Sequence, residues 1–157
     1  MQGRGADGLV FLPAIPRFLK EILQNRASDA ALRGIAKATM AHAARVGARP
    51  PWTGYFAREG EVLVGVGSFA APPSGGEVEI AYHTFTAHEC RGIASAMAGH
   101  LIAVAFAQPV ISAVVANTAP EPSASTRILE KQGFVRDGVA ADDEIGEAWR
   151  WKKSRPL

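Results

Sequence analysis

The sequence predicts a mixed α/β (α+β) domain built around one mostly antiparallel sheet of about six or seven strands, with about four flanking helices. Apolar residues recur at helical spacing in the first part of the chain, up to about residue 47. From residue 52 onward the pattern changes to short β-branched and aromatic runs separated by glycine and proline. The 157 residues, of which 48% are hydrophobic and 20% charged, favour a single globular domain, 1–157.

Apolar periodicity and capping residues mark the helical segments. Residues 16–25 predict an amphipathic helix, because apolar side chains recur there every three or four positions. Ser28 or Asp29 can cap a second helix, which ends near Gly47. The later helices are expected at residues 92–107 and 123–132.

Strands are predicted where β-branched and aromatic residues cluster between turn residues. Gly60 and the proline- and glycine-rich loop 71–76 separate the first three runs. The glycine-rich, polar segment 1–8 is expected to be disordered. The predicted strands are 52–59, 62–70, 77–85, 110–116 and a final hairpin, made of the residues from Phe134 onward and of 147–153.

One apolar stretch, residues 93–116, contains no Asp, Glu, Lys or Arg and is long enough to suggest a membrane helix. Gln108 and Pro109 interrupt it, however, and the residues after Pro109 are largely β-branched. A buried helix followed by a buried strand explains this composition better, so we expect no membrane span. The early apolar run LVFLPAI is broken by Pro13 and lacks a cleavage pattern, so no secretory signal is expected.

The charge pattern argues against a nucleic-acid-binding protein. The net charge is only +2, and the arginines are spread along the chain instead of forming one stripe. The single cysteine, Cys90, allows no internal disulfide and fits a cytoplasmic location. His88 and Glu89 begin like an H-E-x-x-H zinc motif, but Gly92 stands where the second histidine would be. We therefore expect no metal site.

The stretch HECRGIASA, residues 88–96, joins a predicted strand to a predicted helix. The first N–H groups of a helix lack intrahelical acceptors and carry partial positive charge. Gly92 would let a ligand approach the backbone, while Arg91 adds a cation and Ser95 a hydroxyl, so a diphosphate would be held here. The alternative is that Gly92 only makes a turn and that Arg91 is solvated. The pattern is neither a Walker A loop nor a Rossmann fingerprint.

Two separated motifs resemble the GNAT superfamily of acetyl-CoA-dependent N-acetyltransferases. The first is the strand EVEIAYHTF with the later loop RGIAS, where the family has Q/R-x-x-G-x-G/A. The second is SASTRILEKQGF, which is similar to the family's S-x-R-x-L-E-K-x-G-F helix end. The closing WRW also looks like the last strand of a ribosomal-protein-acetyltransferase-like (Rim-type) group. The resemblance covers about residues 52–153.

The chain departs from the family pattern at several positions. Glu89 occupies the Q/R position of the loop, and Cys90 follows it where glycine is frequent. Ser123 stands where an asparagine is often found, and Leu129 where many members carry a tyrosine that acts as general acid. In Rim-type members a serine near Ser125 is proposed for that role. An acidic side chain beside a diphosphate would repel it unless it points away.

The resemblance implies a GNAT-like fold and an N-acetyltransferase that uses acetyl-CoA as cosubstrate, without a metal. The acceptor would be a primary amine, on a protein N-terminus or a small molecule, which attacks directly in a ternary complex. The strand 78–85 would splay from the strand 110–116, and pantetheine would pair with backbone groups in the gap. The implied CoA-binding residues are His83, Thr84, Phe85, Thr86, Cys90, Arg91, Gly92, Ile93, Ala94, Ser95, Ser123 and Arg127.

Three residues are candidates for catalysis. Glu79 would act as a base or hold a water, or it would be an exposed strand residue that faces a lysine or arginine. Tyr82 would donate a proton to the leaving sulfur, or it would only pack. Ser125 would donate to the thiolate, or it would cap the helix that starts near residue 123. A backbone N–H near Tyr82 or His83 would polarise the thioester carbonyl.

Two other functions compete with the acetyltransferase hypothesis. The altered loop and the missing tyrosine also fit a GNAT-like module that binds CoA without useful catalysis, as a sensor or partner subunit. A phosphate-binding or structural domain of another fold is the third alternative. Acetyl-CoA binding would exclude this third alternative. Turnover would then distinguish the acetyltransferase from the CoA-binding module without catalysis. A homodimer is compatible with the fold family, although no motif here indicates one.

Overall fold

The computed structural model of the protein describes residues 8–143 and 146–157. Of the segment 1–8, for which the sequence predicts disorder, all but Gly8 lies outside the described residues. The elements in chain order are β1 (Leu9–Pro13), α1 (Pro16–Gln24), α2 (Ala30–Val46), β2 (Gly54–Glu59), β3 (Val62–Phe69), β4 (Glu77–Thr84), the 3-10 helix η1 (Thr86–His88), α3 (Ile93–Phe106), β5 (Ala113–Thr118), α4 (Ala124–Lys131), β6 (Val135–Asp142) and β7 (Gly146–Ser154).

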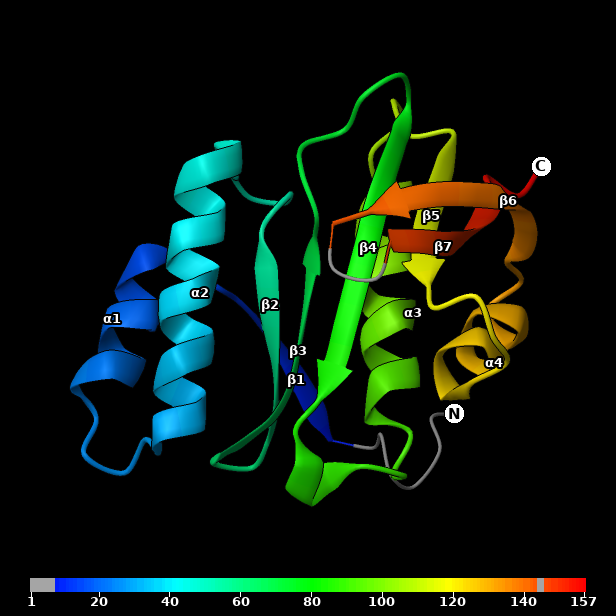
Figure 1. Ribbon diagram of the computed structural model, residues 1–157. Coiled ribbons are helices and arrows are strands. Elements are labelled where there is room, and N and C mark those ends of the chain that lie inside the picture. Colours follow the sequence, from blue (N-terminus) through cyan, green and yellow to red (C-terminus); the bar gives the residue numbers. More distant parts are fainter. Residues whose placement is uncertain (1–7, 144–145) are drawn as a thin grey trace.

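The described strands form one seven-stranded sheet in the order β1-β2-β3-β4-β5-β7-β6 (Figure 1). All neighbouring strands are antiparallel except β4 and β5, which run parallel. Four α-helices accompany the sheet in the described part of the chain. The predicted fold class, a mostly antiparallel mixed sheet flanked by four helices, is therefore confirmed.

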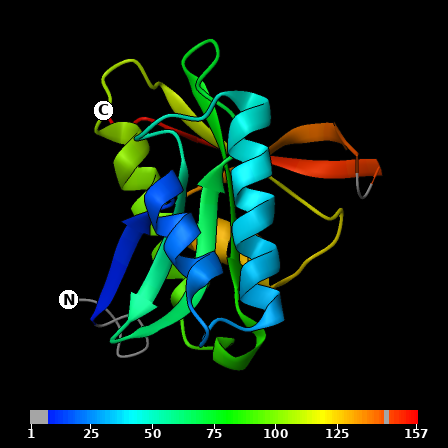
Figure 2. The ribbon, with the colours of Figure 1, turned by 90° about the vertical axis from the view of Figure 1, so that its left-hand side faces the viewer.

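Helices cover both faces of the sheet (Figures 1 and 2). On one face, α1 and α2 bury a cluster that includes Leu19 of α1 and Phe56 of β2. On the other face, α3 and α4 bury a larger cluster that includes Ile80 of β4, Leu101 of α3 and Leu129 of α4. The stretch without charged residues is thus a buried helix followed by a strand, as the sequence predicts. No helix within the described ranges is long and apolar enough to cross a membrane.

The first strand, β1, is absent from the sequence-based prediction. It pairs with β2 along its whole length, from Leu9 opposite Glu59 to Pro13 opposite Tyr55. Five residues at a sheet edge, ended by a proline, give too short a pattern to show strand periodicity. The run LVFL is rich in strand-forming residues, and that was the available signal.

The prediction of a strand over 110–116 is wrong at its start, because β5 begins only at Ala113. The side chain of Arg155 donates hydrogen bonds to the carbonyl oxygens of Phe106, Gln108 and Ile111, at 2.8–3.0 Å. This guanidinium satisfies carbonyl groups at the end of α3 and in the connection that follows it. Val110 in that connection is 68% exposed, so its β-branched side chain signals no strand here.

The parallel contact between β4 and β5 is short. Only three residue pairs join these strands, from Glu77 opposite Ala113 to Glu79 opposite Val115. Beyond them β5 continues beside β7, and β4 continues beside β3 to Thr84. The strands therefore part after Glu79, and this is the splay that the sequence-based comparison implies.

The final hairpin is tied to β5 by a buried hydrogen bond. The indole Nε1 of Trp151 donates to the hydroxyl of Thr118 at 2.9 Å, and both residues are buried. In the same hairpin, the rings of Trp149 and Trp151 pack against each other with centroids 6.5 Å apart, edge to face.

Thr118→Val keeps the shape of this side chain but leaves the Trp151 N–H without an acceptor. We expect the free energy of unfolding to fall by about 1–3 kcal/mol, the usual cost of a buried unsatisfied donor. Urea unfolding of the wild type and of Thr118→Ser, which retains the hydroxyl, provides the comparison. A valine variant as stable as the wild type would show that this hydrogen bond contributes nothing.

Candidate active site

A cavity of about 590 Å³ lies between the end of β4, the start of α3 and one side of α4. We call it the α3–α4 cavity. Its β4 residues come after the last pair with β5, so it opens where the two strands part. Of the implied CoA-binding residues, Phe85, Arg91 and Ser123 do not line it. The lining residues are Tyr82, His83, Thr84, Glu89, Cys90, Gly92, Ile93, Ala94, Ser95, Ala124, Ser125, Arg127, Ile128 and Lys131.

The turn into α3 presents free backbone donors to this cavity. The first helical hydrogen bond runs from the Ala96 N–H to the Gly92 carbonyl, so the three preceding N–H groups have no acceptor within the helix. Gly92 is the N-cap, in the left-handed conformation at φ 77°, and Cys90 is also left-handed at φ 64°. A turn of this kind directs N–H groups to one point and favours an anion.

The cations beside this turn differ in part from those expected. Arg91 does not line the cavity, because its Nη2 donates to both carboxylate oxygens of Glu59 at 2.7 Å. Arg127 and Lys131 of α4 do line it, as does Glu89. Lys131 is a residue that the sequence analysis missed, although its place one helical turn after Arg127 was a usable signal.

Along β4, the backbone N–H and carbonyl groups of successive residues point alternately toward β3 and toward the gap beside β5. Phe85 N–H donates to the Val64 carbonyl, and the Glu79 carbonyl accepts from Ala70 N–H. In an antiparallel pair every second residue faces the partner strand, so the odd-numbered residues of β4 bond to β3. The N–H and carbonyl groups of Tyr82 and Thr84 therefore point into the gap.

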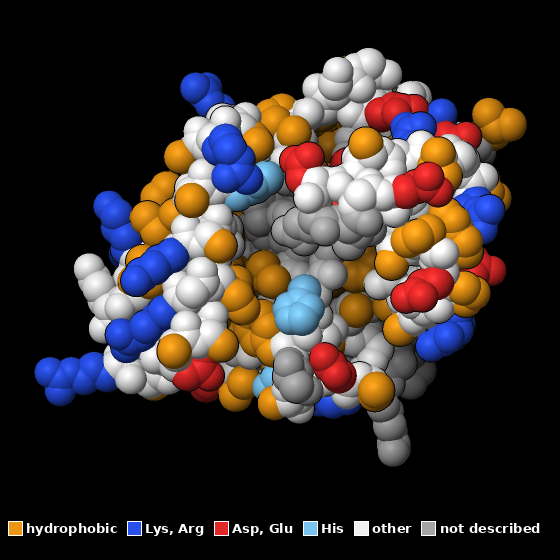
Figure 3. Space-filling view, viewed as in Figure 1, with side chains coloured by type: hydrophobic (Ala, Val, Ile, Leu, Met, Phe, Trp, Pro, Cys, Tyr) orange, Lys and Arg blue, Asp and Glu red, His pale blue; other side chains and the backbone are white. Residues whose placement is uncertain are grey.

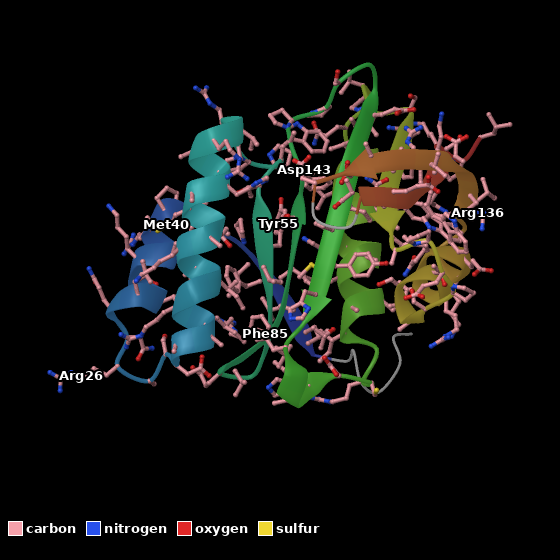
Figure 4. The ribbon with its side chains drawn as sticks, viewed as in Figure 1. Arg26, Met40, Tyr55, Phe85, Arg136 and Asp143 are labelled. Atoms are coloured by element: carbon pink, nitrogen blue, oxygen red, sulfur yellow. The ribbon has the colours of Figure 1, made fainter. Side chains whose placement is uncertain are left out.

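This alternation corrects two expectations. The main-chain N–H of Phe85 is used by β3, and the alternation turns the main chain of His83 to β3 as well. Of the segment His83–Thr86, Thr84 is left to pair with a ligand, and Thr86 begins η1. Figure 4 shows Phe85 at the end of β4, where its side chain packs with the α1–α2 cluster.

The two serines at the start of α4 have different surroundings. Ser123 is the N-cap, and its hydroxyl accepts from Thr126 N–H at 3.2 Å in a capping box. The alternative that Ser125 caps this helix is therefore wrong: Ser125 is exposed in the first turn and lines the α3–α4 cavity. Tyr82 reaches toward it, with its hydroxyl 3.5 Å from the Ser125 carbonyl oxygen.

Two further cavities lie on the opposite face of the sheet. The first, which we call the α2 cavity, has about 300 Å³ between α2 and strands β2 to β4. The second, the α1–α2 cavity, has about 770 Å³ and reaches the β2–β3 turn and η1. Figure 3 shows this side of the molecule hollowed, with hydrophobic side chains inside and lysines and arginines outside. His83 lines all three cavities, and Tyr82 lines both the α2 and the α3–α4 cavities.

Glu79 lies on the α2 side of β4, since it shares the strand face of Ala81 and His83. Burial raises the pKa of its carboxyl group, and the nearby Asp142 raises that pKa further. Arg150 lowers it, but this guanidinium bonds Glu77 and Asp137, at 2.7 and 3.1 Å. Asp142 ends β6, and Figure 4 shows the next residue, Asp143, in front of the sheet. Glu79 is thus half-buried, not the exposed strand residue of the alternative.

The chain belongs to the GNAT acetyltransferases. Its residues 12–135 match the family described as "Acetyltransferase (GNAT) domain". That span includes most of the sheet, the α3 turn and α4. A search of curated protein sequences gives no significant match.

Solved structures with the same fold include enzymes with different acceptors. The aminoglycoside acetyltransferase AAC(6')-Ib in complex with coenzyme A is 15% identical, with TM-score 0.69 over 94% of this chain and 95% of that one. RimJ of Mycobacterium smegmatis in complex with CoA-disulfide is 16% identical, with TM-score 0.68 over 93% and 81%. RimL, a ribosomal L7/L12 alpha-N-protein acetyltransferase, is 14% identical, with TM-score 0.69 over 95% and 91%. At these identities the likeness establishes the fold, and it does not single out the Rim-type branch.

The raised pKa of Glu79 has a consequence for stability. A carboxyl group whose pKa rises on folding binds a proton more tightly in the native state, so stability falls as pH rises from the ordinary value of 4.5 through the raised pKa. Glu79→Gln removes this penalty, and we expect a higher Tm than the wild type at pH 7. Thermal unfolding from about pH 4 to 8 should show the difference shrinking toward acid. A constant difference would contradict the raised pKa.

Proposed function

We propose that the protein transfers the acetyl group of acetyl-CoA to a primary amine, by direct attack in a ternary complex. One observation carries the proposal: the cavity beside the α3 turn, on one face of β4, shares His83 with both cavities of the other face and Tyr82 with one of them. Two ligands that enter from opposite faces would meet there, beside the parted strands. Placing two reactants side by side can by itself supply much of a rate enhancement.

The α3–α4 cavity fits the chemistry of CoA. Its volume lies within the usual range for ligand pockets of about 300–1,000 Å³. The α3 turn offers N–H donors to the diphosphate. Arg127 and Lys131, which line the cavity, would form ion pairs with the phosphate groups. A pantetheine arm in the gap would meet the free backbone groups of Thr84 and Tyr82, as an added strand does.

The thioester carbonyl would be polarised by the backbone N–H of Tyr82. This donor points into the gap and lies on the residue shared by the α2 and α3–α4 cavities. A fixed N–H aimed at the developing oxyanion stabilises charge where it forms. The N–H of His83 is turned to β3, so Tyr82 is the donor of the two that the sequence analysis considers.

The acceptor must lose a proton before it attacks. An α-amino group has a pKa near about 8 and a lysine amine near about 10.4, so both are mainly protonated at neutral pH. Glu79 faces the acceptor side, and its raised pKa makes it a better base than an ordinary carboxylate. We assign it this role, either directly or through a water.

The leaving thiolate would take a proton from Tyr82 or Ser125, which both line the α3–α4 cavity. Burial raises the pKa of Tyr82 to about 12, so its hydroxyl stays protonated at neutral pH. The hydroxyl reaches the first turn of α4, where Ser125 is exposed. The two side chains are therefore alternative donors at one place.

Calorimetric titration with acetyl-CoA, and free-thiol release in the presence of primary amines, test the proposal. We expect micromolar binding and amine-dependent thiol release, with NAD and ATP as controls that do not bind. Binding without any turnover would favour a CoA-binding module without catalysis. The acidic residue Glu89 at the turn is the observation that supports this alternative. No binding at all would overturn both functions.

Gly92→Glu should weaken acetyl-CoA binding about a hundredfold, because it adds negative charge at the helix N-terminus. Nothing lies within 4 Å of a side chain at this position, but the φ of 77° strains a residue with a side chain there. Gly92→Asn is the matched control, since asparagine accepts a left-handed conformation without charge. Equal losses in both variants would place the diphosphate elsewhere.

Glu89→Gln should bind acetyl-CoA about two- to threefold more tightly at low salt, because it removes a like charge from the wall of the cavity. The gain should fade at about 0.5 M salt, where exposed charges are screened. Calorimetry at the two salt concentrations measures both values. A gain that is independent of salt would require another cause.

A further inference from the structure

The α2 cavity differs in chemistry from its neighbour on the same face. None of its lining residues, all of which the structure describes, is Asp, Glu, Lys or Arg. Aliphatic and small side chains, among them Ile35, Ala38, Ala43 and Val66, form much of its wall. The α1–α2 cavity, by contrast, is lined by the acidic side chains of Glu21, Asp29 and Glu61 and by Arg58.

Two hydroxyl groups of the α2 cavity wall, those of Thr39 and Tyr82, are turned away from the space. The Thr39 hydroxyl donates to the Ile35 carbonyl of its own helix at 2.7 Å. Its methyl group faces the sheet, 3.4 Å from where a side chain on Gly54 would begin. The Tyr82 hydroxyl points to α4 on the other face. An apolar group that entered this cavity would therefore cost neither hydroxyl its hydrogen bond. The Nε2 of His42, which also lines the cavity, is buried and already lacks a hydrogen-bond partner.

The α2 cavity opens next to the proposed reaction centre. Ala81, an exposed residue of β4, and His83 both line it, and Glu79 follows on the same strand face. An amine held near Glu79 would place its first carbon atoms beside Ala81. Its remaining part could then reach under α2 toward Ala38.

We propose that the α2 cavity receives the side group of the acceptor, and that the acceptor is a primary amine carrying one compact apolar group. This inference rests on the proposed function and names the substrate class of the same site. About 300 Å³ accommodates a branched alkyl chain or a single aromatic ring. A polyamine or an aminosugar would bring several ammonium groups against a wall without carboxylates, so it is a poor occupant.

The first test compares acceptors of increasing apolar size at one pH. Thiol release is measured with propylamine, 3-methylbutylamine, 2-phenylethylamine and spermidine. We expect kcat/KM to rise about fourfold for each methylene that becomes buried. Spermidine should be a poorer substrate than propylamine. A preference for spermidine, or no dependence on apolar size, overturns the proposal.

The second test fills the cavity from its wall. Ala38→Leu projects into the α2 cavity, whereas Ala41→Leu puts the same residue on an exposed position of α2 that lines none of the three cavities. Leucine is a good helix former, so both variants should fold. The ratio of kcat/KM for 2-phenylethylamine over propylamine should fall about tenfold or more in Ala38→Leu. The ratio should stay at its wild-type value in Ala41→Leu, and equal effects in both variants overturn the proposal.

A binding measurement keeps the inference separate from the proposed function. Saturation-transfer NMR detects 2-phenylethylamine on the protein whether or not acetyl-CoA binds, and Ala38→Leu should remove the signal. If acetyl-CoA binds but the amine neither binds nor reacts, the substrate class is wrong and the CoA site stands. If the amine binds and acetyl-CoA does not, the proposed transfer fails. A peptide amide that begins with phenylalanine is then compared with 2-phenylethylamine as acceptor. The substrate with the higher kcat/KM shows whether the apolar amine belongs to a peptide or to a free small molecule.

Discussion

The short parallel contact between β4 and β5 determines most of what this chain can do. Three residue pairs hold the two halves of the sheet together, and the strands then diverge. The divergence leaves backbone groups of Tyr82 and Thr84 without a strand partner in a protein that buries and pairs most such groups. A longer ladder would close the gap and satisfy these groups within the sheet. Under the proposed function, a bound ligand would pair with them in place of a strand.

Much of the fold was predictable because its signals are local. The helical spacing of α1, the Asp29 cap of α2 and the turn residues around β3 each act within a few positions. The turn into α3 was predictable for the same reason, since Gly92 and the charge-free start of α3 are adjacent in sequence. β1 was missed because five edge residues carry no period, and the start of β5 was misplaced because a distant arginine, Arg155, binds the carbonyl groups there.

The parts of the site that escaped prediction depend on contacts between distant segments. Arg91 has the right sequence position for a phosphate contact, but Glu59 lies 32 residues away and takes its guanidinium. The orientation of the β4 backbone follows from its register with β3, which fixes Tyr82 and not His83 as the donor toward the gap. The α2 cavity has no motif, because its wall comes from three strands and a helix whose residues are individually ordinary.

The position of His83, on the walls of all three cavities, bears on the order of events in catalysis. Under the proposed function, one ligand would enter through the cavity on the α3 side of the sheet and the other through the cavity on the α2 side. Neither path crosses the other, so a molecule bound on one face leaves the entrance on the other face open. Such an arrangement imposes no compulsory sequence of arrival or departure, and each product can leave by the route through which its precursor entered.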